Sequence, residues 1–132
     1  MQIADRVTFH GFLADDRVRE RSSDWLAGMA LYEPSVADCV EYADPSKVKF
    51  YLELEVPVIM TDVTYLAERI RNAGAGAIVD TDIGNIWREI ELLNRDFDRY
   101  LPGIRTLKRE MEYRSAYDAG FSGILRSGAI CK

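Results

Sequence analysis

The pattern of apolar and polar positions divides the chain into short apolar runs that alternate with longer amphipathic segments. Short apolar runs bounded by turn residues are typical of buried strands, and apolar positions spaced three or four apart predict helices. The pattern predicts four strands, at residues 6–9, 27–32, 56–60 and 77–79. It predicts helices at residues 15–26, 63–73, 83–97 and 104–111, another from residue 46, and a short one at 117–125.

Fully apolar strands that alternate with helices indicate a parallel sheet covered on both faces. The run "VPVIM" at residues 56–60 is the clearest buried strand, and its Pro57 suits a strand start. We therefore expect one α/β domain over residues 1–132. It should be a Rossmann-like, three-layer parallel sheet of about four strands, with flanking helices and a helical C-terminal region. Trp25 and Trp87 lie on apolar faces and are expected in the core.

Composition narrows the class of protein. The 132 residues carry a net charge of −5, which argues against a binder of nucleic-acid phosphates. Cys39 and Cys131 have no Cys or His partner at metal spacing, so we expect reduced thiols and no metal site. No apolar run approaches the roughly 20 residues of a membrane span, and the first residues lack a signal-peptide pattern. These features predict a cytoplasmic protein.

Ligands of parallel sheets bind beyond the carboxyl ends of the strands. The candidate binding residues are those that follow the expected strands or begin the helix at residue 46, namely His10, Gly11, Glu33, Ser46, Lys47 and Thr61. A lone histidine is more often structural than catalytic, so His10 is a binding candidate only. Glu33 could bond a sugar hydroxyl or cap its own loop.

The stretch "DPSKVKFYLELEVPVIMTD" at residues 44–62 combines a turn, a helix start and a buried strand. Ser46 is the expected helix cap. A cation at Lys47 opposes the positive end of the helix dipole, and a bound anion would remove that conflict. On spacing alone, a solvated surface lysine is the simpler interpretation.

The order of these motifs resembles the C-terminal, donor-binding half of GT-B fold glycosyltransferases of the retaining, group 1 (family 4) type. The similar stretches are "RVTFHGF", "SSDWLAGMALYEPS", "DPSKVKFYLELEVPVIMTDV", "LAERIRNAGAGAIVD" and "YRSAYDAGFSGIL". The resemblance implies a nucleotide-diphosphate sugar as donor substrate, with the diphosphate at Ser46 and Lys47. It implies that the loop of His10 and Gly11 faces the nucleotide, and that neither metal nor cofactor is needed.

Two residues depart from the family pattern. Phe50 stands where the family has a glutamate that contacts the donor ribose, so ribose recognition is in doubt, and Glu55 stands where a glycine precedes the Pro-Val strand. We expect Phe50 to pack inward. The resemblance also implies a missing N-terminal acceptor domain, without which the chain should have little activity. It leaves room for peripheral membrane association of the full enzyme.

A central strand of the family's sheet also has no counterpart in this sequence. The strands at residues 6–9 and 56–60 would lack their usual neighbour, so either they pair directly in a narrower four-stranded sheet or a second copy covers the gap. We expect a homodimer or larger assembly. The alternative interpretation is a non-catalytic α/β module that binds a partner chain through its exposed edges and C-terminal helices.

Overall fold

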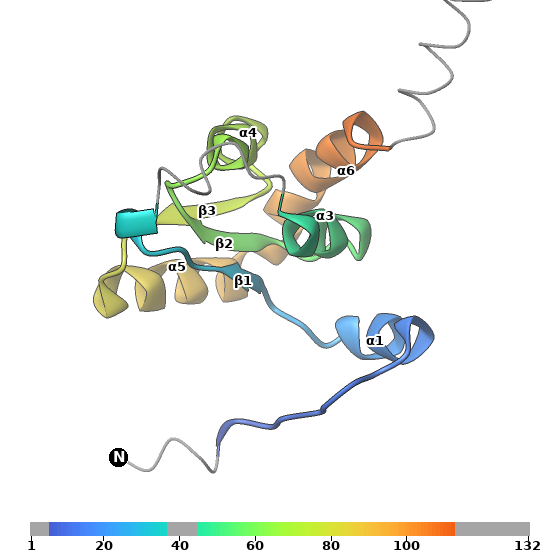
Figure 1. Ribbon diagram of the computed structural model, residues 1–132. Coiled ribbons are helices and arrows are strands. Elements are labelled where there is room, and N and C mark those ends of the chain that lie inside the picture. Colours follow the sequence, from blue (N-terminus) through green and yellow to red (C-terminus); the bar gives the residue numbers. More distant parts are fainter. Residues whose placement is uncertain (1–5, 37–44, 113–132) are drawn as a thin grey trace, which may run out of the picture.

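A computed structural model describes residues 6–36 and 45–112 of the chain. Within these residues the fold is α/β, with three parallel strands and five α-helices (Figure 1). The sheet has the order β1-β2-β3, in which β1 spans Gly28–Ala30, β2 spans Val58–Thr61 and β3 spans Gly76–Val79. The α/β class and the parallel sheet predicted from the sequence are confirmed.

The expected count of about four strands is wrong for the described part of the chain. Residues 7–13, which we call the N-terminal arm, form neither helix nor strand, although a strand was predicted at residues 6–9. The other three predicted strands are present with shifted bounds. The central strand that the resembled family has, and this sequence lacks, leaves no gap beside β2. Strands β1 and β2 pair directly, from Gly28 with Val58 to Ala30 with Met60.

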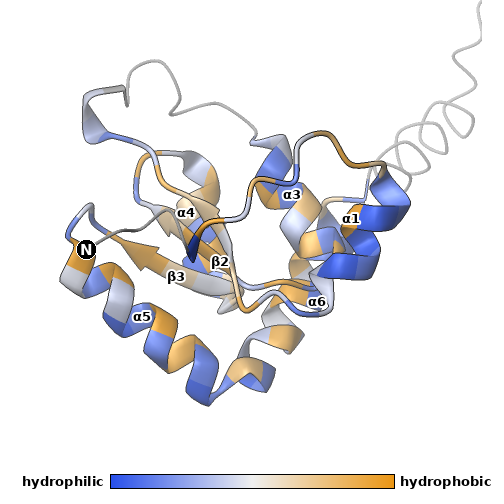
Figure 2. Cartoon of the chain, turned by 90° about the horizontal axis from the view of Figure 1, so that it is seen from below, coloured by the Kyte–Doolittle hydropathy of each residue, from blue (hydrophilic) through white to orange (hydrophobic). Residues whose placement is uncertain are grey.

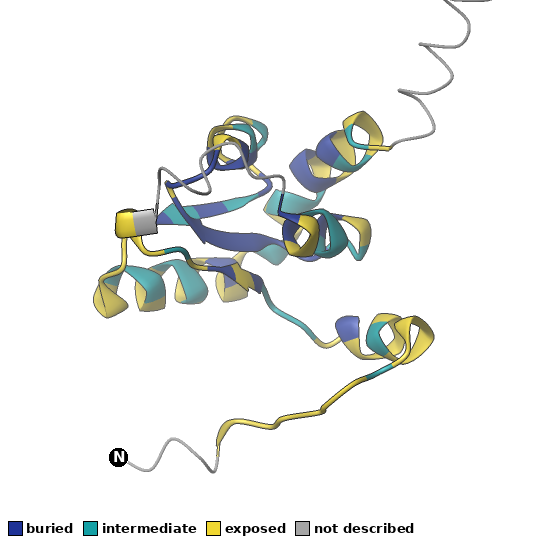
Figure 3. Ribbon diagram, viewed as in Figure 1, coloured by how far each residue is buried: buried dark blue, intermediate teal, exposed yellow. Residues whose placement is uncertain are grey.

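The central strand β2 is buried along its whole length, because helices cover both faces of the sheet. On one face, Val58 and Met60 pack under α3 (Ser46–Glu53), α4 (Tyr65–Ala73) and α6 (Leu101–Glu110). On the other face, Ile59 packs under α5 (Ile83–Arg95). Alternate side chains of one strand therefore serve two cores, as the period of a strand requires. Figure 3 shows β2 as the most buried part of the sheet.

The helices of the larger core are held by local signals and by close packing. Helix α4 buries Leu66, Ala67 and Ile70, and ends at Gly74, which adopts a left-handed φ of 66°. Glycine is favoured there because it has no Cβ to clash. Helix α6 packs so closely on α4 that a Cβ at Gly103 would lie 2.0 Å from the carbonyl oxygen of Ala73.

Helix α5 differs from the predicted apolar stripe. Asp82 caps it by accepting a hydrogen bond from the backbone N–H of Asn85. The residues facing the sheet are Ile86, Ile90 and Leu93. Ile83 and Trp87 instead lie on the solvent side, with 81% and 61% of their surface exposed, so the prediction of Trp87 as core is wrong. A short 3-10 helix, Phe97–Tyr100, then leads directly into α6, so the last described helix begins at Leu101 rather than at the predicted residue 104.

Helix α1 (Asp15–Ser22) lies between the N-terminal arm and β1 (Figure 1). It contacts α3 through an ion pair between Arg19 and Glu53. Beyond its end, the rings of Trp25 and Tyr51 meet edge to face with centroids 6.5 Å apart. Trp25 is half-buried by this contact. The helix predicted at residues 117–125 lies outside the described residues.

Candidate functional site

A hollow of about 360 Å³ lies at the carboxyl edge of the sheet. The residues lining it come from the ends of β2 and β3, the loops that follow these two strands, the 3-10 helix Pro34–Val36 after β1, and α4: Pro34, Thr61, Asp62, Val63, Arg71, Ile78, Val79, Asp80 and Thr81. This is the edge at which parallel sheets bind ligands. Of the binding residues predicted from the sequence, Thr61 lines the hollow, and Glu33 precedes the lining residue Pro34.

Two carboxylates dominate the electrostatics of this hollow. Asp62 forms an ion pair with Arg71 from α4. Asp80 accepts hydrogen bonds from the side-chain amide of Asn85, at 2.9 and 3.1 Å, and from the backbone N–H of Asp82, at 3.0 Å. The Asn85 amide, followed by the Asp82 backbone N–H, lowers the pKa of Asp80 below its usual value. Carboxylate oxygens accept hydrogen bonds, so both side chains offer acceptors to ligand hydroxyl groups.

Thr61 is buried and its hydroxyl has a structural task. Its Oγ1 accepts a hydrogen bond from the backbone N–H of Tyr32, at 2.8 Å, and donates one to the Tyr32 carbonyl oxygen, at 2.9 Å. The side chain thus continues the β1–β2 pairing beyond the last backbone ladder position. In the described residues, these two hydrogen bonds hold the Tyr32 backbone at the point where it leaves the sheet.

Helix α3 begins at the same edge. Its N-cap is Pro45, whose carbonyl oxygen accepts from the backbone N–H of Val48, so Ser46 is already the first helical residue and the prediction of Ser46 as cap is wrong. Lys47 is exposed, and its Nζ lies over the Tyr32 ring, 4.8 Å from the centroid. This cation–π contact gives the lysine a favourable partner without any ligand.

His10 and Gly11 lie in the N-terminal arm, and both are exposed. Because the arm is not a strand, the reason for expecting these two residues at the carboxyl edge of the sheet does not hold. Gly11 adopts a φ of 64°, which marks a turn within the arm. A binding role for His10 and Gly11 stays a prediction. Glu33 is exposed between β1 and the 3-10 helix Pro34–Val36.

The two positions that depart from the resembled family have clear environments. Phe50 is half-buried, and the guanidinium of Arg19 lies 5.8 Å from its ring centroid. The expected inward packing is therefore only partial. Glu55 has a positive φ of 59°, the conformation that glycine adopts most easily. Its carboxylate accepts from Arg105, at 2.9 and 3.0 Å, and lies 3.5 Å from Lys108.

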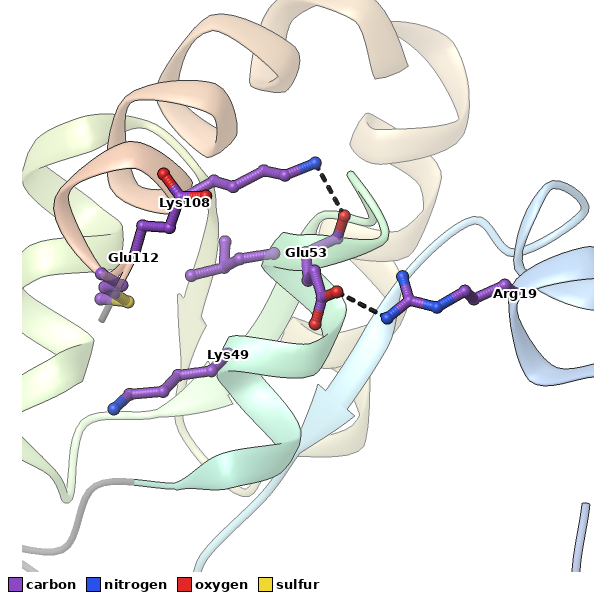
Figure 4. Close-up of a pocket in the computed structure, with 7 residues that line it drawn as sticks. Arg19, Lys49, Glu53, Lys108 and Glu112 are labelled. Carbon is purple, nitrogen blue, oxygen red and sulfur yellow. Dashed lines mark hydrogen bonds and ion pairs between the residues drawn. The ribbon is translucent and has the colours of Figure 1, made fainter. Parts of the chain in front are cut away.

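A second hollow, of about 380 Å³, lies between α1, α3 and α6 (Figure 4). Its lining residues are Arg19, Lys49, Leu52, Glu53, Lys108, Met111 and Glu112. Glu53 is its centre, because Arg19 pairs with its carboxylate and Lys108 donates to its backbone carbonyl oxygen at 2.9 Å. These contacts join three helices at the C-terminal end of α3, whereas Lys47 lies at the other end of that helix.

Sequence reasoning found parts of the carboxyl-edge hollow and missed others. The loop positions 61–62 and 81–82 follow directly from the strand pattern. Arg71 was missed because it lies near the end of α4, and nothing in its spacing indicates that it reaches back to Asp62. Asp80 was missed because its importance depends on Asn85, which the turn of α5 brings close. The second hollow was missed because its residues come from helices far apart in the sequence.

Comparison with known proteins finds no matching family model, no matching curated protein and no matching solved structure. In the described part of the chain, no helix is long and apolar enough to cross a membrane. The same residues contain no group of three or more His, Cys, Asp or Glu side chains arranged to hold a metal ion.

Proposed function

We propose that this domain binds a nucleotide-diphosphate sugar at the carboxyl edge of its sheet, as the donor half of a retaining GT-B glycosyltransferase. The observation that carries the proposal is the contact of Lys47 with Tyr32. It brings a cation and the start of α3 to the edge where the acid-lined hollow opens. The proposal also rests on the ordered motifs of the sequence, which resemble those of the family.

The start of α3 suits the diphosphate of such a donor, and the hollow lined by Asp62 and Asp80 suits its sugar. Backbone N–H groups of the first turn of α3, the Ser46 hydroxyl and the Lys47 ammonium can hold the diphosphate. Asp62 and Asp80 would repel phosphate, but carboxylates accept hydrogen bonds well from sugar hydroxyls. Tyr32 joins the start of α3 to the hollow, since its ring contacts Lys47 and its backbone is bonded to Thr61 in the hollow.

The chemistry that this half would supply is stabilisation of the leaving diphosphate. Transfer of the sugar builds negative charge on the departing phosphate oxygen, and a helix N-terminus with a lysine offsets that charge without a metal ion. Retention at the anomeric carbon and the identity of the acceptor depend on an N-terminal partner domain. We therefore expect binding, and little or no turnover, from this domain alone.

A thermal-shift screen with uridine, guanosine and adenosine diphosphates and their sugars tests the proposal. A ligand that binds only the folded state stabilises it by RT ln(1 + L/Kd), where L is the ligand concentration, so Tm rises with the logarithm of the ligand concentration above Kd. Lys47→Ala should weaken binding by about 1–3 kcal/mol, the range for a charge-assisted contact. Lys49→Ala is the matched control, because it removes the same charge from the same helix but lines the other hollow.

Equal nucleotide affinity of wild type and Lys47→Ala by titration calorimetry would contradict the assignment of the diphosphate site. The absence of stabilisation by every nucleotide would favour the second candidate function, a non-catalytic module that binds a partner chain. One observation favours that candidate. Phe9 and Phe12 of the N-terminal arm have 92% and 99% of their surface exposed, which is unusual for large apolar side chains of an isolated domain.

A further inference from the structure

The N-terminal arm exposes apolar side chains that a stable fold normally covers. Phe9 and Phe12 are almost fully exposed, and Val7 is exposed to 45%. The arm nevertheless has a strand-like composition, "VTFHGFL", rich in the β-branched and aromatic residues that favour strands. In Figure 2 a hydrophobic stretch of the arm leads into α1. The arm therefore has the sequence of a strand but pairs with no strand among the described residues.

The outer edge of β1 has the complementary deficiency. In the sheet of the described residues, β1 pairs with β2 on one side, and no strand pairs with its other side. An edge without a paired strand can accept another strand through backbone hydrogen bonds. Next to this edge, Met29 is 42% exposed and Leu31 is 41% exposed, since α5 covers the sheet over β3 rather than over β1.

The spacing of the exposed side chains matches in the two segments. Val7 and Phe9 are two residues apart, as are Met29 and Leu31, so each pair lies on one face of an extended chain. Pairing Thr8 with Ala30 would bring Val7 and Phe9 against Met29 and Leu31 in either strand direction. Cross-strand pairs of aromatic and aliphatic side chains are the units that stabilise a sheet.

The connection within one chain keeps the arm apart from its own β1 edge. Helix α1, which follows the arm, contacts α3 through the ion pair of Arg19 and Glu53, and the arm runs below the sheet, separated from β1 (Figure 1). We propose that the arm of one copy pairs with the β1 edge of a second copy, and that the exchange is reciprocal. Such an exchange uses the same surface on both copies, so it closes as a two-fold dimer.

The area available agrees with a stable dimer. Each phenylalanine buries about 150–250 Å², so the two copies of Phe9 contribute on the order of 300–500 Å². Val7 of both arms, and Met29 and Leu31 of both copies, lose further area in the same contact. Together these residues approach the roughly 1,200 Å² at the lower end of specific protein–protein interfaces. The strand hydrogen bonds add direction to this apolar contact.

Light scattering of the full chain across a dilution series tests the dimer. We expect wild type to show twice the monomer mass, and Phe9→Asp combined with Phe12→Asp to raise the dissociation constant at least about ten-fold. Ile83→Asp is the control, because it also replaces an exposed apolar side chain with a carboxylate, but on α5. A monomeric wild type, or a dimer that Ile83→Asp disrupts and the arm variant does not, would overturn the proposal. Circular dichroism checks that each variant folds.

Disulfide trapping distinguishes exchange from pairing within one chain. In a background with Cys39→Ser and Cys131→Ser, one preparation carries Phe9→Cys, and the other carries Met29→Cys or Leu31→Cys. Mixing and mild oxidation should give a covalent dimer, through Met29→Cys if the strands are antiparallel and through Leu31→Cys if they are parallel. A chain carrying both cysteines that closes only on itself, at all concentrations, would refute the exchange.

Discussion

The region around β2 and β3 is packed more completely than the region around β1. Strand β2 has neighbours on both edges and helices on both faces, and all four of its residues are buried. In the part of the chain that the structure describes, strand β1 has one neighbour, and its middle residue Met29 is exposed. The N-terminal arm, only one helix away in the sequence, has no strand neighbour among the described residues. The domain is therefore well packed around β2, β3, α4 and α6, and incomplete on the side of β1.

This difference shows that a strand depends on its neighbours more than on its own sequence. The arm and β2 both contain β-branched and apolar residues. Measured strand preference mainly reflects packing against cross-strand neighbours, which β2 has and the arm lacks. A hydrogen-bonded partner is also required for the backbone groups of a strand. The predictions below test the contrast between the packed side and the incomplete side, from the largest expected effect to the smallest.

Leu66→Ala should give the largest loss of stability. Leu66 is fully buried in the core between α4 and the sheet, and truncating such a leucine costs about 2–5 kcal/mol through lost burial and the cavity left behind. Phe12→Ala removes a larger side chain from the incomplete side and should change the free energy of unfolding by less than about 0.5 kcal/mol. Urea denaturation at a concentration that keeps the protein monomeric measures both. Similar losses in the two variants would contradict the contrast.

Gly103→Ala tests the close contact of α6 with α4. The new methyl group would lie 2.0 Å from the Ala73 carbonyl oxygen, which is backbone and cannot rotate away. The helices must separate, so we expect a loss of about 1–3 kcal/mol even though alanine favours helix formation. Gly84→Ala is the control, because its Cβ would approach only the Asp82 carboxylate, at 3.0 Å. Unchanged stability of Gly103→Ala in urea would show that the contact is looser than described.

The sequence predicts the packed side of the fold far better than the incomplete side. Local spacing located β2, β3 and α4 because each buries residues at its own period and ends at a clear signal, such as Gly74. The strand predicted in the arm failed because pairing is a long-range property. Trp87 was wrongly expected in the core because its position fits an apolar stripe, while the choice of buried face depends on where α5 meets the sheet.

The candidate site divides in the same way. The loops that follow the strands could be located from the sequence, because parallel sheets bring their carboxyl ends to one edge. The partners of the side chains could not. A bound anion was one explanation for a cation at Lys47. The Tyr32 ring that contacts Lys47 could not be predicted, because the contact joins two elements that are separate in the sequence. The role of Thr61 in holding the Tyr32 backbone likewise depends on the β1–β2 register.

Thr61→Val tests whether the Thr61 hydroxyl group holds the segment after β1 against β2. Valine keeps the shape of threonine but removes both hydrogen bonds to the Tyr32 backbone, so we expect a loss of about 1–2 kcal/mol. Thr61→Ser keeps the hydroxyl group. Hydrogen exchange of the Tyr32 amide separates the two variants: exchange should quicken in Thr61→Val and stay slow in Thr61→Ser. Equal exchange in both would show that the hydroxyl does not fasten Tyr32.

The smallest expected effect concerns Glu55, which joins α3 to α6 on the packed side. The hydrogen bond from Arg105, assisted by the positive charges of Arg105 and Lys108, lowers the pKa of Glu55 below its ordinary value of 4.5. The unfolded chain then binds more protons than the folded protein between the lowered value and 4.5, so stability rises with pH in that window. The contribution is complete above pH 4.5 and is lost as the pH falls through the folded pKa.

Glu55→Gly separates this ion pair from the strain of the backbone. At neutral pH the variant loses exposed ion pairs worth about 0.2–1 kcal/mol each, and gains relief of a left-handed conformation that costs non-glycine residues about 1–2 kcal/mol. The two effects nearly cancel, so the two proteins should have similar stability at pH 7. Once the pH has fallen through the folded pKa of Glu55, the wild type has lost the ion-pair contribution while its backbone strain remains, so Glu55→Gly should then be the more stable protein. Denaturation curves of both proteins from pH 7 to pH 3 measure the difference in the free energy of unfolding. Glu55→Gln is the control, because it removes the charge but keeps the strained backbone, so it should not become more stable than wild type at low pH. A difference between wild type and Glu55→Gly that stays constant over this range would show that the carboxylate contributes no pH-dependent contact to the packed side.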